Sequence, residues 1–236
     1  MVMSMHLVYT IGYSGYGNTP EAMIVELTKR KINVLIDVRS NPYSAQFNGY
    51  NKESFAALLS QYGIKYRNYA NFFGAKQEDS AFYSKFDGTD SRIDYELFTK
   101  SEQFKQGVKN METIVEKGLI SVIMCSEKDP INCHRAIMVA KTLSQEYGFE
   151  IKHIVPEKED ETQEELEKRM MNTISCELRK KKKLNVLEKK MKEKIAESES
   201  LFADELDNYT KDVNNYYRII NSRIGWTREE VLGYKK

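Results

Sequence analysis

Most of the side chains in this sequence that could do chemistry lie in one short segment, residues 125–135. It reads Cys-Ser-Glu-Lys-Asp-Pro-Ile-Asn-Cys-His-Arg and follows an apolar run typical of a buried strand. Pro130 predicts a helix start, so Cys133 and the two residues after it fall in or near the first turn, where free backbone N–H groups favour an anion. Arg135 adds a bidentate donor for phosphate or carboxylate. The segment therefore predicts a pocket for an anionic substrate.

The same segment predicts a nucleophile and a proton carrier. A helix start and a neighbouring arginine lower the pKa of a cysteine toward a reactive thiolate, which we expect for Cys133. Cys133 or Cys125 is then the candidate nucleophile, and His134 or Glu127 the candidate acid or base. The alternative is structural: Cys125 ends a buried strand and Cys133 is a small helical residue beside a surface histidine.

The spacing argues against several known chemistries. Nine residues separate Cys125 from Arg135 and one separates Cys133 from Arg135, which does not match the loop of cysteine phosphatases or a sulfur-transfer loop of similar build. For zinc, Cys125, Cys133 and His134 give only three ligands, and neighbouring side chains on a helix diverge by roughly 100°. We therefore expect no metal, and the cofactor is unknown.

Further polar residues follow two other expected strands. Gly12 and Ser14 come after the first strand, in a turn that would let backbone amides approach a ligand. The spacing of Gly12, Gly15 and Gly17 does not match that of a dinucleotide-binding loop. Asp37 and Arg39 come after the second strand. Asp37 could hold an arginine or act as a base, and a structural ion pair is an equal alternative.

Strands and helices alternate through the first 156 residues. The expected strands cover 7–11, 34–38, 64–69, 119–124 and 149–155, and the expected helices end near Lys31, Gly63, Gly118 and Gly148. This alternation predicts an α/β fold, a small doubly wound and mostly parallel sheet of about five strands. Ligands bind beyond the carboxyl ends of such strands, so the three polar segments should converge at one edge. Residues 71–91 show no period and predict a functional loop.

The charge balance divides the chain into two segments. The 236 residues carry 36 Lys and Arg against 35 Asp and Glu, a net charge of +1, which excludes a globally basic nucleic-acid binder. Residues 1–156 hold 18 basic and 17 acidic side chains, whereas residues 157–236 hold 18 of each in about half the length. We therefore expect an α/β domain over 1–156 and a charged helical extension over 157–236.

The extension shows an apolar stripe at helical spacing between blocks of charge. The blocks are acidic over 157–167, basic over 179–194 and acidic again from Glu197 to Asp207. The stripe predicts a long helix or a helical hairpin that packs on the domain or on another chain, so an oligomer formed through the tail is one alternative. Thr227 with Glu230 predicts a capping box. The stripe consists of Leu166, Met170, Ile174, Leu178, Leu184, Leu187, Met191 and Ile195.

The composition favours a cytoplasmic protein. No apolar run approaches the roughly 18–20 residues that cross a bilayer, so no membrane association is expected. Met1 to His6 lack the pattern of a secretory signal. The sequence has three cysteines, an odd number, and is long enough to build a core without disulfides. We therefore expect the cysteines to be reduced.

The three polar segments together resemble the signature segments of the domain of unknown function 488 family. They are Thr10 to Ser14, Asp37 to Pro42, and Cys125-x-Glu127-x-x-Pro130-x-x-Cys133-His134-Arg135. The resemblance covers roughly residues 7–156 and implies an α/β sheet with these segments at strand ends. Tyr13 departs from the family, whose members often carry histidine there. The resemblance supplies no substrate.

Two functions follow from the sequence. The first is an enzyme-like domain that binds an anionic, phosphate-bearing small molecule or nucleotide-like ligand. Its pocket would be lined by Gly12, Ser14, Asp37, Arg39, Cys125, Glu127, Cys133, His134 and Arg135. The second is a non-catalytic nucleic-acid- or protein-binding module, in which the arginines, loop aromatics and the basic tail contact a polymer and the cysteines are structural. The loop aromatics include Tyr43, Phe47, Tyr50, Phe72, Phe73, Tyr83 and Phe86. Whether the chain is an enzyme is left open by the sequence.

Overall fold

The computed structural model describes residues 6–86, 90–198 and 208–233. By contacts the chain divides into two compact units, the first formed by Met1–Lys76 with Glu96–Gln163 and the second by Gln77–Tyr95 with Glu164–Lys236. The domain boundary expected at residue 156 stays a prediction. Residues 1–5 and most of the acidic block from Glu197 to Asp207 lie outside the described residues.

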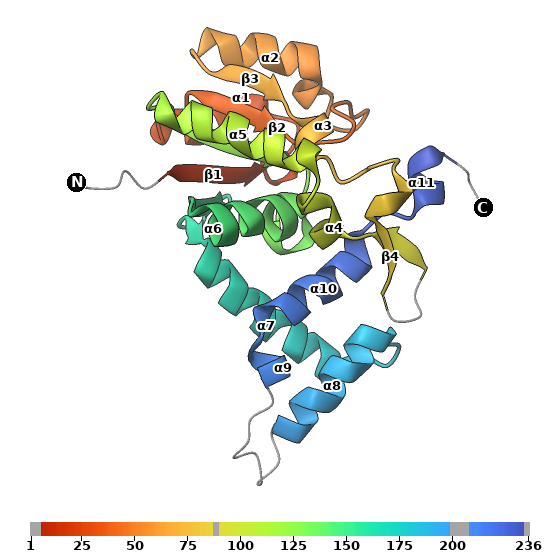
Figure 1. Cartoon of the computed structure of the whole chain (residues 1–236). Helices are drawn as coiled ribbons and strands as arrows, with labels where there is room; N and C mark the ends of the chain where they lie inside the picture. The colour runs from red at the N-terminus through yellow and green to blue at the C-terminus, as the bar shows by residue number, and fades with distance from the viewer. Residues whose placement is uncertain (1–5, 87–89, 199–207, 234–236) are drawn as a thin grey trace. The chain divides into compact units, whose positions relative to one another are not determined.

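The first unit contains a six-stranded sheet, which confirms the predicted α/β fold (Figure 1). Its order is β3-β2-β6-β1-β7-β8, and all neighbouring strands are parallel except β8, which is antiparallel to β7. The five parallel strands are those expected from the apolar runs, and the two-residue β8 is an addition. The strands are β1 (Leu7–Gly12), β2 (Val34–Asp37), β3 (Lys65–Asn68), β6 (Ser121–Cys125), β7 (Glu150–Ile154) and β8 (Glu161–Thr162).

Helices connect these strands in a doubly wound arrangement. The strand order reverses direction after β3, so right-handed crossovers place α1 and α2 on one face and α5 and α6 on the other. Figure 1 shows α5 lying against the sheet. The connecting helices are α1 (Pro20–Lys29), α2 (Lys52–Gln61), α5 (Glu102–Glu116) and α6 (Lys141–Tyr147), with the short α3 (Ala70–Phe73) and α4 (Tyr95–Thr99) between α2 and α5.

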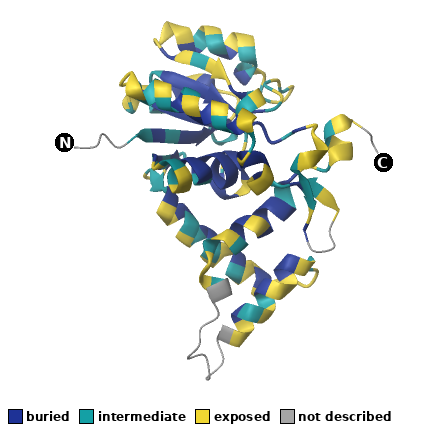
Figure 2. Cartoon of the chain, in the orientation of Figure 1, coloured by how far each residue is buried: buried dark blue, intermediate teal, exposed yellow. Residues whose placement is uncertain are grey.

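The central strands are buried along their whole length. Every residue of β2 and of β6 is buried, as expected for parallel strands covered on both faces. In Figure 2 the strands of this sheet are largely dark blue, the colour of buried residues. The apolar stripes of α1 and α2 pack on one face of these strands. The core cluster there includes Met23, Leu27, Phe55 and Leu59 from the helices with Ile11, Leu35, Val122 and Met124 from the strands.

The structure differs from the sequence prediction in two segments. The helix expected from Pro130 is interrupted: a 3₁₀ turn (Pro130–Asn132) comes first, then Cys133 in extended conformation, then a π-helical stretch (Arg135–Ala140) that continues into α6. Asp129 explains the interruption, because its side chain accepts a hydrogen bond from the Ile131 N–H and closes the 3₁₀ turn. Cys133 is therefore not a helical residue.

The segment 71–91 is also more ordered than predicted. Besides α3, it contains a 3₁₀ turn (Ser80–Phe82) and the strand β4 (Tyr83–Lys85), which pairs with β5 (Ser91–Ile93) as an antiparallel hairpin. These strands have three residues each, too few to show a period of two in the sequence. The hairpin belongs to the second unit.

The rest of the second unit is helical. Its helices are α7 (Gln163–Lys180), α8 (Val186–Ser198), α9 (Asn208–Lys211), α10 (Val213–Ile224) and α11 (Arg228–Leu232). All members of the predicted stripe except Leu184 are buried, and Thr227 and Glu230 form the predicted capping box. The carboxylate of Glu188 is buried and accepts hydrogen bonds from Lys181 and Arg223.

Candidate functional site

The carboxyl ends of three neighbouring strands bring the predicted site residues together. Gly12, the last residue of β1, is in register with Cys125, the last residue of β6, and Asp37 at the end of β2 is in register with Met124. Parallel strands end at the same edge, so the segments that follow them start side by side. Ser14, in the 3₁₀ turn Tyr13–Tyr16, donates its backbone N–H to the Ser126 carbonyl at 3.0 Å and ties two of these segments together.

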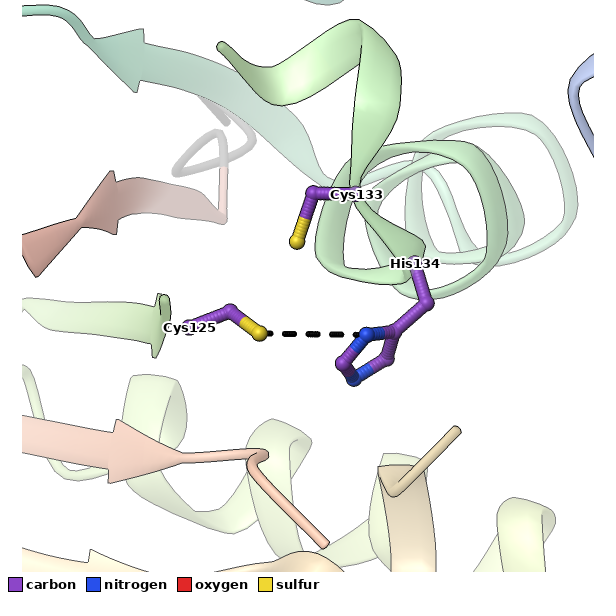
Figure 3. A group of neighbouring side chains, drawn as sticks. All are labelled: Cys125, Cys133 and His134. Atoms are coloured by element: carbon purple, nitrogen blue, oxygen red, sulfur yellow. Dashed lines mark hydrogen bonds between the residues drawn. The ribbon is translucent and has the colours of Figure 1, made fainter. Parts of the chain in front are cut away.

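Two sulfurs and an imidazole form a buried cluster at this edge. One donor atom from each of Cys125, Cys133 and His134 lies within 4.8 Å of the others, and all three residues are buried. The sulfur of Cys125 is 3.8 Å from Nδ1 of His134. Figure 3 shows the sulfur of Cys133 and the ring of His134 both directed toward Cys125. The extended backbone of Cys133, with φ −136° and ψ 133°, separates it from the helix and allows this convergence.

Glu127 completes the cluster from the solvent side. Its Oε2 accepts hydrogen bonds from the thiols of Cys133, at 2.9 Å, and Cys125, at 3.3 Å, while Oε1 accepts from the hydroxyl of Ser126 at 2.8 Å. Burial by itself raises the pKa of Glu127, but the thiol of Cys133 and the hydroxyl of Ser126 outweigh it and lower the pKa to about 2. Glu127 is therefore a carboxylate at neutral pH, in contact with both thiols.

The expected thiolate at Cys133 is wrong for the chain without a ligand. Burial raises the pKa of the Cys133 thiol well above its usual value, the neighbouring Cys125 adds to this, and the positive charge of Arg135 opposes it without overcoming it. The prediction assumed a helix start and a neighbouring arginine, but Cys133 is extended and almost fully enclosed. It is a neutral thiol that donates to Glu127.

His134 has a defined orientation. Its Nε2 lies 3.2 Å from the carbonyl oxygen of Val38, and a carbonyl can only accept, so we place the ring proton on Nε2. In the neutral ring Nδ1 then keeps its lone pair, directed at Cys125. Burial lowers the pKa of His134, but hydrogen bonds with Cys133 and the Val38 carbonyl and the charge of Glu127 outweigh it, so the pKa is raised. His134 is buried, not the surface histidine of the structural alternative.

Arg135 donates hydrogen bonds to backbone carbonyls of the site. Its side chain is fully buried and donates from Nη1 to the carbonyl of Glu127 at 2.6 Å and from Nη2 to the carbonyl of Lys128 at 3.2 Å. The same carbonyl of Glu127 passes so close to Gly12 that a Cβ there would sit 1.8 Å from it. Arg135 and Gly12 thus fix the loop that carries Glu127.

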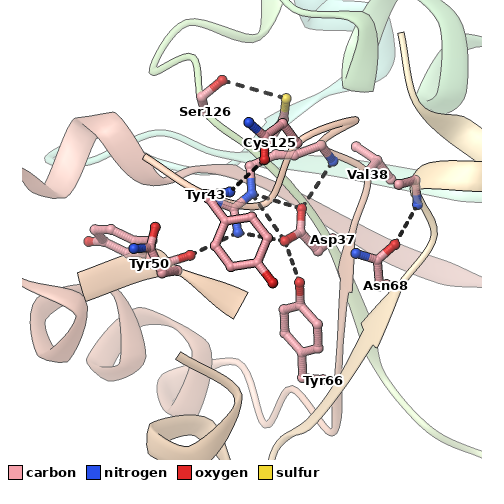
Figure 4. A network of polar contacts seen from close by, with 12 residues as sticks. Asp37, Val38, Tyr43, Tyr50, Tyr66, Asn68, Cys125 and Ser126 are labelled. Carbon is pink, nitrogen blue, oxygen red and sulfur yellow. Dashed lines mark hydrogen bonds and ion pairs between the residues drawn. The ribbon is translucent and has the colours of Figure 1, made fainter. Parts of the chain in front are cut away.

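A second polar network lies at the end of β2. Nε of Arg39 donates to both carboxylate oxygens of Asp37, at 2.9 and 3.0 Å, and Nη2 donates to Oδ2 at 2.6 Å and to the carbonyl of Tyr50 at 2.8 Å. The hydroxyl of Tyr66 on β3 donates to the same Oδ2 at 2.6 Å. Figure 4 shows this network with Cys125 and Ser126 in the same view. Of the two alternatives for Asp37, a catalytic base or a structural ion pair, the geometry shows the ion pair.

One part of this network is not satisfied. Nη1 of Arg39 is buried and has no hydrogen-bond partner among the described residues. The guanidinium lies 5.1 Å from the ring centroid of Tyr13, which stacks in turn on Tyr50. Burial raises the pKa of Tyr13, opposed by the charge of Arg39, and the charges of Cys125 and Glu127 raise it further. Tyr13 therefore lies between the two networks.

The sequence prediction missed Tyr66 and the carbonyl of Val38. Tyr66 reaches Asp37 because β2 and β3 pair with Leu35 opposite Tyr66, and nothing in the spacing of either strand specifies that register. A backbone carbonyl has no signature in a sequence. Tyr13 was noticed only as a departure from a family pattern, yet its ring contacts Arg39.

An open cavity lies elsewhere in the first unit. It measures about 610 Å³ and is lined by charged residues of α1 and of the loop after β7, among them Glu26, Arg30 and Asp160. Arg30 donates to both carboxylates there. No residue of the cysteine–histidine cluster lines it.

The aromatic residues suggested for polymer binding are only partly accessible. Tyr50, Phe73 and Phe86 are buried and offer no open stacking face, Phe47, Phe72 and Tyr83 are half-buried, and Tyr43 is exposed. In the basic block Arg179 and Lys180 form the last turn of α7, where cations complement the helix dipole, and Lys181 pairs with Glu188. The geometry does not favour the polymer-binding module.

The fold and the site define an α/β protein with a cysteine–histidine cluster at the carboxyl edge of a parallel sheet. The family model described as "Domain of unknown function DUF488" matches residues 19–142, more than half of the chain, and the chain belongs to this family. The match contains the second and third signature segments, and Thr10 to Ser14 precedes it. No curated protein and no solved structure matches the chain significantly. Within the described residues, every helix is too short or too polar to cross a membrane.

Proposed function

We propose that this chain is an enzyme-like protein that binds an anionic, phosphate-bearing ligand at the carboxyl edge of its parallel sheet. Its reaction centre is the cluster of Cys125, Cys133 and His134 with Glu127. The observation that supports this most is that these groups, drawn from separated parts of one loop, meet within hydrogen-bonding distance. A structural pair of thiols would need neither the carboxylate nor the imidazole, and perturbed ionisable groups gather at functional sites.

Arg39 is the residue we assign to the anion. Its Nη1 is a buried donor without a partner among the described residues. Nε of Arg135 is likewise buried and unpartnered there, but both Nη atoms of Arg135, at the end of its guanidinium, already donate to carbonyls of the loop. A phosphate oxygen at Nη1 would satisfy this donor, as buried polar groups require. Arg135 is then a positioning residue that holds Glu127, and Gly12 lets the carbonyl of Glu127 pass close to the end of β1.

Within the cluster, Glu127 is the proton acceptor. It is ionised at neutral pH and contacts both sulfurs. Of the two thiols, Cys133 is disfavoured as a nucleophile, because burial raises its pKa and keeps it protonated.

Binding of inorganic phosphate and of nucleoside monophosphates, measured by calorimetry, tests the proposal. Asp37→Asn with Arg39→Gln removes both charges of the buried pair and should weaken binding at least about tenfold, the loss expected for one charged hydrogen bond. Arg67→Gln, at an exposed arginine of β3, is the matched control and should bind as the parent does. The proposal fails if none of these probes binds, or if the double variant folds and binds unchanged.

A further inference from the structure

The donor atoms of the cluster have the spacing of a metal site. Zinc binds sulfur at about 2.3 Å and imidazole nitrogen at about 2.0–2.1 Å, so its tetrahedral ligands lie about 3.5–3.8 Å from one another. The sulfur of Cys125 is 3.8 Å from Nδ1 of His134, and the sulfur of Cys133 lies within 4.8 Å of both partners. We propose that Cys125, Cys133 and His134 bind a zinc ion, an assignment that rests on the proposed function only for the place of the site.

The orientation of His134 supports the zinc site independently. Histidines that bind a metal usually donate the N–H of the other ring nitrogen to a carbonyl or carboxylate, which fixes the ring and the tautomer. Nε2 of His134 has this partner in the carbonyl of Val38, at 3.2 Å. Nδ1 is left with its lone pair toward the sulfurs (Figure 3). A histidine that served only to fill the core would not need its second nitrogen aimed at two thiols.

The charges also match a divalent cation. Both thiols donate to one carboxylate oxygen of Glu127, so the cluster holds two exchangeable protons beside a negative charge. When zinc binds, the thiols of Cys125 and Cys133 lose these protons to solvent and become thiolates, and two Zn–S bonds form without a change of oxidation state. Two thiolates neutralise the 2+ charge of the ion, which removes most of the cost of burying it.

The backbone conformation of Cys133 removes the sequence-based argument against zinc. Adjacent side chains diverge on a helix, but Cys133 is extended and only His134 begins the helical stretch. The turn capped by Asp129 and the two hydrogen bonds from Arg135 hold the loop that carries Cys125 and Glu127 against this start. The three ligand residues are therefore in place before a metal arrives.

Three protein ligands leave a fourth position on zinc, as catalytic sites do. Glu127 follows Cys125 by two residues, the placement that zinc-dependent deaminases use for a glutamate that is not a ligand but moves protons. A water on the fourth position would pass one proton to the carboxylate of Glu127 and remain on the metal as hydroxide. In this assignment the two sulfurs are ligands and the water is the nucleophile.

Cobalt(II) and zinc binding to the full purified chain tests the site. We expect one equivalent of metal, with thiolate-to-cobalt charge-transfer absorption and the intense visible bands of tetrahedral cobalt. Cys125→Ser, Cys133→Ser and His134→Gln should each weaken binding by more than the roughly 10–100-fold that loss of an outer partner costs, and Glu127→Gln should fall within that range. Cys176→Ser, at the exposed cysteine, should bind as the parent chain does. Circular dichroism of each metal-free variant identifies any that fail to fold.

Alkylation gives a second readout that does not depend on the folding of variants. Zinc should protect Cys125 and Cys133 of the parent chain from a thiol reagent and leave Cys176 unprotected. The inference is overturned if the folded parent binds less than about a tenth of an equivalent, or if the cysteine and histidine variants bind as tightly as the parent. Phosphate binding by the metal-free chain, measured separately, shows whether the proposed function stands when the zinc site does not.

Discussion

Arg39 and Asp37 form a side-on ion pair in which Nε bridges both carboxylate oxygens and Nη2 binds one of them at 2.6 Å. Both side chains are buried, and Tyr66 donates a further hydrogen bond to Asp37. The pair therefore joins the end of β2 to β3 and, through the carbonyl of Tyr50, to the loop before α2. It leaves Nη1 of Arg39 buried and without a hydrogen-bond partner among the described residues.

Asp37→Asn should lower the free energy of unfolding by about 3–5 kcal/mol, because it leaves the charge of Arg39 buried without a counter-ion. Chemical denaturation followed by circular dichroism measures the change. Glu102→Gln is the control: it breaks an exposed pair with Lys105 and should cost less than about 1 kcal/mol. A loss as small as that of the control would show that the pair at Asp37 is not buried in solution. The double variant Asp37→Asn with Arg39→Gln should lose less than the sum of its single variants.

The sequence predicts the layers of the fold better than the contacts of the site. The apolar runs at β2 and β6 and the stripes of α1 and α2 follow from burial alone, which hydrophobic pattern encodes. The conformation of Cys133 depends instead on a capping hydrogen bond within a turn, and the contact of Tyr66 with Asp37 depends on strand register. The three polar segments meet at the carboxyl edge because of the sheet topology, which the sequence predicts. The burial that raises the pKa of Cys133 depends instead on packing between segments that are distant in the sequence.

Gly12→Ala should disturb the site more than a glycine substitution in open space. Its Cβ would lie 1.8 Å from the carbonyl oxygen of Glu127, a backbone atom that can move only if the loop moves. Gly17→Ala is the comparison, because a Cβ there meets nothing within 4 Å and the cost comes only from the backbone, whose φ of 60° and ψ of −146° strain an alanine by about 1–3 kcal/mol. We expect Gly12→Ala to unfold at lower denaturant than Gly17→Ala and to lose cobalt binding. Equal stability and intact binding in both variants would show that the loop does not pass over Gly12.

The three cysteines should differ sharply in reactivity when no metal is present. Cys125 and Cys133 are 3 % and 1 % exposed, whereas Cys176 is exposed. In the native chain at neutral pH, one thiol should therefore react with an alkylating reagent at the rate of a free cysteine, and the other two about tenfold or more slowly, because their reaction requires local opening. Mass spectrometry of the peptides assigns each rate, Cys176→Ser should abolish the fast phase, and denaturant should expose all three. Fast modification of Cys125 in the folded chain would instead support a thiol nucleophile.

Glu188 should make the second unit sensitive to acid. Burial raises the pKa of its carboxyl, but hydrogen bonds from Lys181, the Asn185 backbone and Arg223 outweigh this, so the pKa in the folded chain is lowered. A carboxyl with a lowered folded pKa contributes stability that is complete above its unfolded pKa, about 4.3, and is lost as pH falls through the folded value.

Comparison of the parent chain with Glu188→Gln measures this contribution directly. The variant should unfold about 1.5–3 kcal/mol more easily at pH 7, the range for hydrogen bonds to a charged group, and the difference should shrink as the pH is lowered below about 4. Fluorescence of Trp226, the single tryptophan and a residue of the second unit, follows the transition. Glu193→Gln, at an exposed position of α8, should change stability by less than about 0.5 kcal/mol. A difference between parent and Glu188→Gln that stays constant from pH 7 to acid would mean that the carboxylate charge of Glu188 does not stabilise the unit, and that only the shape of the side chain matters there.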